Sequence, residues 1–203
     1  FPTSGSLYNE LGKLMWAQKS YEAIKIWEKG IEVAPSFSKN YFNASKYYYF
    51  STDKVWSIIY GEIFLNMEPM STSSPEIKNI LLDSYKKLFV DADVQKNKND
   101  NSPFVQAFLQ TVFKQFSVIS SGINTESLIM LRTRFVLDWF NDFGTKFPYR
   151  LFDWQKQLLQ EAVYGNMVTG FHRTELKDII NKIYDTGFRP GTGAFYGHGC
   201  YGT

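Results

Sequence analysis

Few residues in this 203-residue chain have the types and spacing that catalysis requires. The two histidines are His172 and His198, so a histidine-rich metal site or a serine triad lacks most of its components. His198 and Cys200 are the one histidine and cysteine that lie close together, and on an extended chain they would be about 7 Å apart. That spacing is too long for the direct hydrogen bond that activates a thiol. We therefore predict no catalytic residue, and assign His172 to a helix start or the surface.

Two Asp-Trp pairs are the other residues with catalytic potential, Asp138-Trp139 and Asp153-Trp154. Two carboxylates at a suitable separation can hydrolyse a glycosidic bond while a tryptophan stacks on the sugar. Both tryptophans, however, lie on apolar stripes of predicted helices, so we assign them to the core. Neither a metal nor a cofactor is predicted, since the glycines of the tail lack the following helix of a phosphate-binding loop.

The composition is that of a folded, aromatic-rich globular protein. Hydrophobic residues make up 44% of the chain and aromatic residues 18%, which is too apolar for a disordered segment. The formal net charge is +2 and charges of both signs are interleaved, so neither nucleic acid nor an anionic membrane is a favoured partner. No apolar run approaches the roughly 18 residues of a membrane span. The single cysteine excludes an internal disulfide framework, and leaves open a reducing compartment or an exported protein.

In residues 7–69, the apolar residues recur at helical spacing in two similar units. In the first unit two stripes predict a pair of helices: Leu7, Leu11, Leu14 and Met15, then Ile24, Trp27 and Ile31. Pro35 ends the first unit and Pro69 ends the second, 34 positions later. A short turn between two such helices makes an antiparallel pair, so residues 7–69 predict two consecutive helical hairpins.

Residues 7–69 resemble the tetratricopeptide repeat family, in which W-x2-L-G-x2-Y is followed by A-x3-F and a proline. The matching residues of the first unit are Tyr8, Leu11, Gly12, Met15, Ala23, Trp27, Gly30 and Pro35. Those of the second unit are Tyr41, Ala44, Ser45, Tyr48, Ser57, Gly61, Phe64 and Pro69. The first unit is one residue short between its halves, and Ala-Ser replaces Leu-Gly in the second.

The resemblance implies a peptide-binding groove, because in that family the first helix of each unit lines a concave surface. Carried over by position, the groove residues of the first unit are Asn9, Lys13 and Trp16. Those of the second unit are Phe42, Asn43, Lys46 and Tyr49. Aromatic side chains are good anchors because they lose little rotamer entropy, and the lysines are suited to an acidic side chain or a chain terminus. An alternative is that the helices of the back half cover this surface.

The rest of the chain predicts further helices of a different kind. Pro75 opens one, and a polar stretch at residues 91–102 separates it from the next, which carries Val105 to Ile119. These two form either a degenerate third unit or, as we favour, a packing layer. Three more helices are predicted: one capped by Asn124 or Thr125, one after Pro148 that ends before Gly165, and one from Thr174 to Gly187.

The sequence thus predicts an all-α fold of antiparallel helix pairs, a tetratricopeptide-like superhelix with a divergent C-terminal helical cap. The predicted divisions are helical repeats at 1–90, a cap at 103–187 and an extended Gly- and aromatic-rich tail at 188–203. The favoured function is a non-catalytic scaffold or adaptor that binds a protein or peptide. The alternatives are a carbohydrate- or small-molecule-active protein with a site between repeats and cap, and an oligomerising structural module.

Overall fold

The computed structural model describes residues 3–90, 102–119 and 122–168, with side chains described up to residue 161. These residues form helices and no strand, so the predicted all-α class is confirmed. The helices are α1 (Gly5–Ala17), α2 (Ala23–Val33), α3 (Ser38–Tyr49), α4 (Lys54–Met67), α5 (Ser74–Val90), α7 (Pro103–Phe113), the short 3-10 helix η1 (Phe116–Ile119), α8 (Thr125–Asp142) and α9 (Arg150–Val168). The predicted helix at 174–187, the tail at 188–203, both histidines and Cys200 lie outside the described residues.

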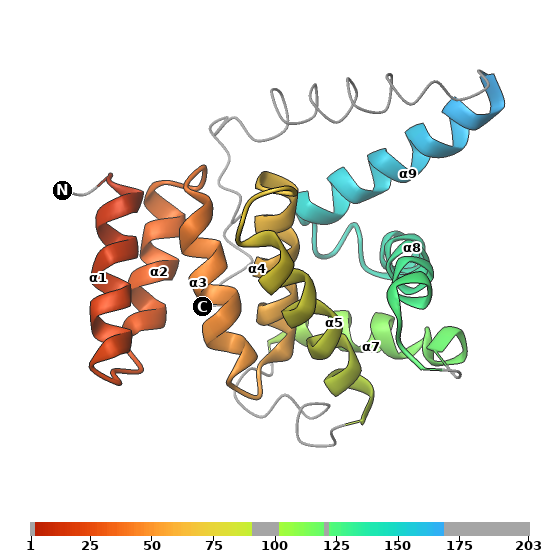
Figure 1. Cartoon of the computed structure of the whole chain (residues 1–203). Helices are drawn as coiled ribbons and strands as arrows, with labels where there is room; N and C mark the ends of the chain where they lie inside the picture. The colour runs from red at the N-terminus through yellow and green to blue at the C-terminus, as the bar shows by residue number, and fades with distance from the viewer. Residues whose placement is uncertain (1–2, 91–101, 120–121, 169–203) are drawn as a thin grey trace.

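The front of the molecule is a row of packed helices, α1 to α5 (Figure 1). Helix α1 packs on α2, α3 packs on α4, and α5 packs on both α4 and α3. Side chains 34 positions apart meet across this row: Asn43 Nδ2 donates to Asn9 Oδ1 at 2.7 Å, and Tyr49 Oη donates to Asp83 Oδ2 at 2.7 Å. The sequence period therefore corresponds to a repeated contact, first between α1 and α3 and then between α3 and α5.

Small residues allow the two helices of each pair to approach closely. A Cβ on Gly12 of α1 would lie 2.3 Å from the indole of Trp27 on α2. In the second pair the glycine is on the other helix, since a Cβ on Gly61 of α4 would lie 3.0 Å from Ser45 Oγ of α3. Ser45 Oγ also donates to the Ser57 carbonyl oxygen of α4 at 2.8 Å, which satisfies a hydroxyl that is buried between the helices.

The leucine stripe that predicted α1 does not face its neighbours. Its members Leu7, Leu11 and Leu14 are 47%, 45% and 57% exposed, whereas the buried residues of α1 are Gly5, Asn9 and Gly12. Close approach to α2 and α3 requires small residues on the packing side of α1. Helix α1 lies at the end of the row (Figure 1), and these three leucines are exposed there.

The back of the molecule, α7 to α9, is joined to the front by aromatic packing. Phe104 of α7 stacks on Trp56 of α4, with 5.9 Å between ring centroids, and contacts Trp139 of α8 at 5.5 Å. Trp139 is fully buried, as its apolar stripe predicted. Asn124 caps α8 through a reciprocal pair of hydrogen bonds with Ser127.

The end of α9 differs from the prediction. The helix was expected to stop before Gly165, but it continues through that residue to Val168. A glycine inside a helix costs only about 1 kcal/mol relative to alanine, so it does not by itself end one.

Candidate functional site

A cavity of about 260 Å³ lies between α1 and α3, on the face where equivalent residues of the two helices meet. It is surrounded by two positively charged side chains and four aromatic rings. Three of the rings come from α1, from α3 and from the residue that follows α3, and the fourth is a tryptophan of α2. Its lining residues are Lys13, Trp16, Ala17, Trp27, Asn43, Lys46, Tyr47 and Phe50. Four of the seven predicted groove residues are thus brought to one site.

Aromatic rings form the apolar part of this cavity. The Trp16 ring lies 5.0 Å from the Tyr47 ring, edge to face, and 6.0 Å from the Trp27 ring. Trp27 is buried, whereas Trp16 is 39% exposed and Phe50 is 70% exposed. Tyr47 is held in place because its hydroxyl donates to the carbonyl oxygen of Tyr21 at 3.1 Å. The wall therefore combines two rings that are held in place, Trp27 and Tyr47, with two that are exposed to a ligand, Trp16 and Phe50.

Two ammonium groups flank the rings, and no carboxylate of the residues that the structure describes lines the cavity. Lys13 Nζ lies 2.9 Å from a carboxylate oxygen of Glu10, and Lys46 Nζ lies 2.7 Å from one of Glu76. The Glu10 and Glu76 side chains are 65% and 49% exposed, so these pairs are surface ion pairs that contribute little to stability. The Lys13 ammonium, through its hydrogen bond, lowers the pKa of the Glu10 carboxyl.

The other three predicted groove residues lie outside the cavity lining. Asn9 is buried beneath it, where it accepts the hydrogen bond from Asn43 and donates to Glu10 Oε1 at 2.8 Å. Phe42 packs on the ring of Phe64, 5.3 Å between centroids, and Tyr49 is bonded to Asp83 on α5. Both therefore serve contacts between helices.

Four lining residues were not among the predicted groove residues, namely Ala17, Trp27, Tyr47 and Phe50. Tyr47 and Phe50 each lie one residue after a predicted groove position, Lys46 and Tyr49, so the family pattern did not include them. Trp27 was placed on the apolar stripe of its helix, and it does belong to the core while reaching the cavity from below.

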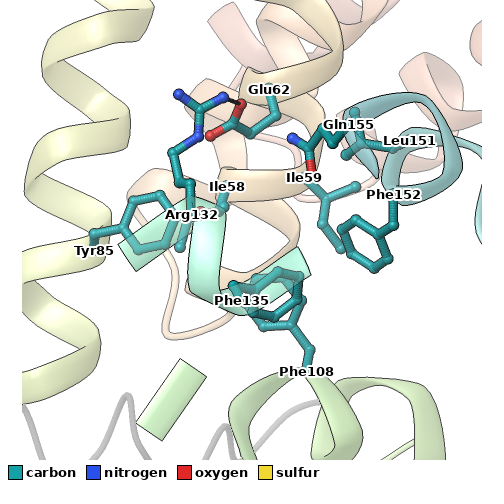
Figure 2. A pocket seen from close by; sticks show the side chains of 10 residues that line it. All are labelled: Ile58, Ile59, Glu62, Tyr85, Phe108, Arg132, Phe135, Leu151, Phe152 and Gln155. Carbon is teal, nitrogen blue, oxygen red and sulfur yellow. Dashed lines mark hydrogen bonds and ion pairs between the residues drawn. The ribbon is translucent and has the colours of Figure 1, made fainter. Parts of the chain in front are cut away.

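A second, much smaller cavity of about 10 Å³ lies where α4, α5, α7, α8 and α9 meet (Figure 2). Figure 2 shows Arg132 of α8 and Glu62 of α4 pointing toward one another, and the two side chains form an ion pair. Glu62 is 3% exposed, and its second carboxylate oxygen has no hydrogen-bond partner in the described residues. The cavity has room for about one water molecule, which is too small for a substrate.

Burial governs the ionisation of this cluster. It raises the pKa of the Glu62 carboxyl, and the charge and hydrogen bond of Arg132 partly offset that effect. Burial likewise raises the pKa of the neighbouring Tyr85 hydroxyl. The pair therefore acts as an electrostatic link between α4 at the front and α8 at the back.

The Asp-Trp pairs do not form an open carbohydrate site around Trp139. That ring is enclosed by other aromatic rings, including Phe135, Phe147 and Phe152, and has no exposed surface. The adjacent Asp138 carboxylate accepts a hydrogen bond from Gln115. This arrangement matches the core role predicted for Trp139. Trp154 of the second pair is half-buried and lies outside the core cluster, so the core role predicted for it was wrong.

In the part of the chain that the structure describes, no cluster of three or more His, Cys, Asp or Glu side chains has the arrangement of a metal site. Among those same residues, no helix is long and apolar enough to cross a membrane. The chain matches none of the protein-family models, curated proteins or solved structures with which it was compared.

Proposed function

We propose that this protein is a non-catalytic scaffold that binds a protein or peptide partner at the cavity between α1 and α3. The observation that carries the proposal is the cavity itself, where exposed Trp16 and Phe50 lie beside two lysines. Exposed aromatic anchors next to polar groups are typical of protein interfaces, because such side chains bury a large area at a small entropic cost.

The size of the cavity favours a side chain of a protein over a free small molecule. Sites for drug-sized ligands and cofactors usually enclose about 300–1,000 Å³. The present cavity, at about 260 Å³, lies at the lower edge of that range and is open to solvent beside the exposed Trp16 and Phe50. One or two side chains of a larger partner would fill it, while the backbone of that partner continues across α1 and α3.

We further propose that the front of the molecule is a tetratricopeptide-like array in which α1, α3 and α5 are equivalent first helices. The contacts between Asn9 and Asn43 and between Tyr49 and Asp83, each 34 positions apart, support that equivalence.

Replacing both open rings tests this function. We expect Trp16→Ala with Phe50→Ala to abolish capture of partners from an extract of the source organism, because it removes both anchors. The immobilised domain would be used as bait and bound proteins identified by mass spectrometry. Thermal unfolding followed by circular dichroism would confirm that the variant folds.

Met70→Ala is the matched control, since Met70 is an 89% exposed side chain in the turn between α4 and α5. It should capture the same partners as the parent. If the double variant also captures them, the cavity is not the binding site.

A further inference from the structure

We infer that the cavity between α1 and α3 takes an internal segment of a partner in which one bulky apolar side chain is flanked by carboxylates. This inference rests on the proposed function and specifies the ligand of the same site. The apolar side chain would enter between Trp16, Tyr47 and Phe50. The carboxylates would lie at the rim, against Lys13 and Lys46.

The charges of the lining decide against a cationic ligand. An aromatic-walled pocket attracts cations, including quaternary ammonium groups, through the negative faces of its rings. Here, however, two ammonium groups line the same space, and none of the described lining residues carries a negative charge. A cation would be repelled by both lysines, whereas an anion beside an apolar group is matched by the lysines and the rings together.

The lysines can exchange their present partners for those of a ligand. Glu10 and Glu76 are well exposed, so the ion pairs they make are weak and lose little when broken. A ligand carboxylate held at the cavity by its apolar neighbour would compete from a high local concentration. The two glutamates therefore act as intramolecular competitors that weaken binding of acidic ligands.

The amide groups on this face do not provide a clamp for the peptide backbone. Asn9 is buried and bonded to both Asn43 and Glu10, and Asn43 donates its amide to Asn9. Recognition consequently depends on side chains of the ligand, namely the apolar residue in the cavity and the acidic residues at its rim.

Three peptides of equal length test the inference, each with Gly and Ser flanks, an acetylated N-terminus and an amidated C-terminus. Their centres are Glu-Phe-Glu, Lys-Phe-Lys and Glu-Ala-Glu, and binding to the full chain is measured by calorimetry at low salt. We expect Glu-Phe-Glu to bind at least about tenfold tighter than Glu-Ala-Glu, because it buries an aromatic ring. It should also bind tighter than Lys-Phe-Lys. Amidation excludes a terminal carboxylate as the recognised group.

Two double variants of the protein should change the affinity for Glu-Phe-Glu in opposite directions. Lys13→Gln with Lys46→Gln should weaken binding of Glu-Phe-Glu and reduce its dependence on salt. Glu10→Gln with Glu76→Gln should strengthen it, because the competing carboxylates are removed. Lys29→Gln with Glu32→Gln, an exposed pair on α2, is the matched control and should leave binding unchanged.

Equal binding of the three peptides, or no binding by any of them, would overturn the inference. So would a Glu10 and Glu76 double variant that binds no tighter than the parent. These outcomes are distinct from failure of the proposed function, which is judged by whether the Trp16 and Phe50 double variant loses its partners. If the Trp16 and Phe50 double variant loses its partners but the parent does not bind Glu-Phe-Glu, the binding site stands and only the inferred ligand is wrong.

Discussion

At the scale of single residues, the Glu62–Arg132 pair is the contact whose loss should cost most. We expect Arg132→Met to lower the free energy of unfolding by about 3 kcal/mol, since it leaves a carboxylate buried without its counter-charge. Glu62 is 3% exposed and cannot reach bulk water without a rearrangement of α4. Urea unfolding followed by circular dichroism measures the change.

The double variant Glu62→Leu with Arg132→Met separates loss of the ion pair from loss of packing. It should recover much of the lost stability, because it leaves no buried charge. An Arg132→Met variant as stable as the parent would show that water reaches Glu62 in solution.

Residue identities at the cavity were partly predictable, and the reason is the repeat. The resemblance to the tetratricopeptide family assigned groove positions on the first helix of each unit, and those positions identified Lys13, Trp16, Asn43 and Lys46 of the cavity. No period relates Glu62 to Arg132, which are 70 positions apart on helices of different kinds. A contact of that type depends on how two unlike parts dock, and the sequence pattern holds no information about that docking.

At the scale of elements, the two faces of α1 should respond in opposite ways to substitution. Replacing Leu7, Leu11 and Leu14 together with Gln should change the free energy of unfolding by only about 0.5 kcal/mol per site, because all three are exposed. Gly12→Ala should cost about 1–3 kcal/mol from overpacking against buried Trp27. That loss would occur although alanine has a helix propensity about 1 kcal/mol better.

Urea unfolding of both variants tests this assignment, and a large loss in the leucine variant would contradict it. The same leucine variant examines self-association. If the outer face of α1 joins two copies, light scattering should show a concentration-dependent mass for the parent and a monomer for the variant. A parent that stays monomeric at high concentration would dismiss the oligomeric alternative.

Most of the helices were predictable because their apolar residues recur with a period of about 3.6, and those of the second unit were predicted from the family resemblance. The orientation of α1 was not, since a stripe of leucines shows that a helix has an apolar face but not which neighbour covers it. The end of α9 was missed for a related reason: a lone glycine is a weak stop, and packing or continued hydrogen bonding overrides it.

At the scale of the whole molecule, buried Glu62 and half-buried Glu28 should make stability depend on pH in mildly acidic solution. Burial raises the pKa of Glu28, whose carboxylate accepts hydrogen bonds from Tyr48 of α3 at 2.9 Å and Tyr60 of α4 at 3.1 Å, and also that of Glu62. In the unfolded chain a glutamate titrates near 4.5. Above that pH the folded state binds more protons than the unfolded state, so the free energy of unfolding should fall as pH rises.

Glu28→Gln should flatten this slope, because an amide oxygen can accept from the same tyrosines but does not titrate. The free energy of unfolding would be measured for both proteins from pH 4.5 to pH 7, above the range in which Asp83, with its lowered pKa, begins to gain protons. Identical slopes for the parent and the variant would contradict the assignment to Glu28.

The arrangement of front and back parts was beyond prediction from the sequence. It depends on Phe104, which stacks on Trp56 in one part and contacts Trp139 in the other. Of these three residues only Trp139 was placed on an apolar stripe, and a stripe identifies a core residue without saying which residues it contacts. The proposed binding site lies in the front part, between α1 and α3, where the spacing of the two similar units indicates which helices are neighbours.

The exchange of large and small residues between the two front hairpins has a consequence for how the chain folds. Repetitive chains are prone to pair a helix with the wrong copy of its neighbour. Here α1 offers Gly12 to the indole of Trp27, while α3 offers Ser45 to Gly61. If α3 paired with α2, a serine would collide with that indole, and if α1 paired with α4, two glycines would face each other across a gap. The large and small residues therefore fit only in the native helix pairs. This disfavours incorrect helix pairing within one chain and domain swapping between chains.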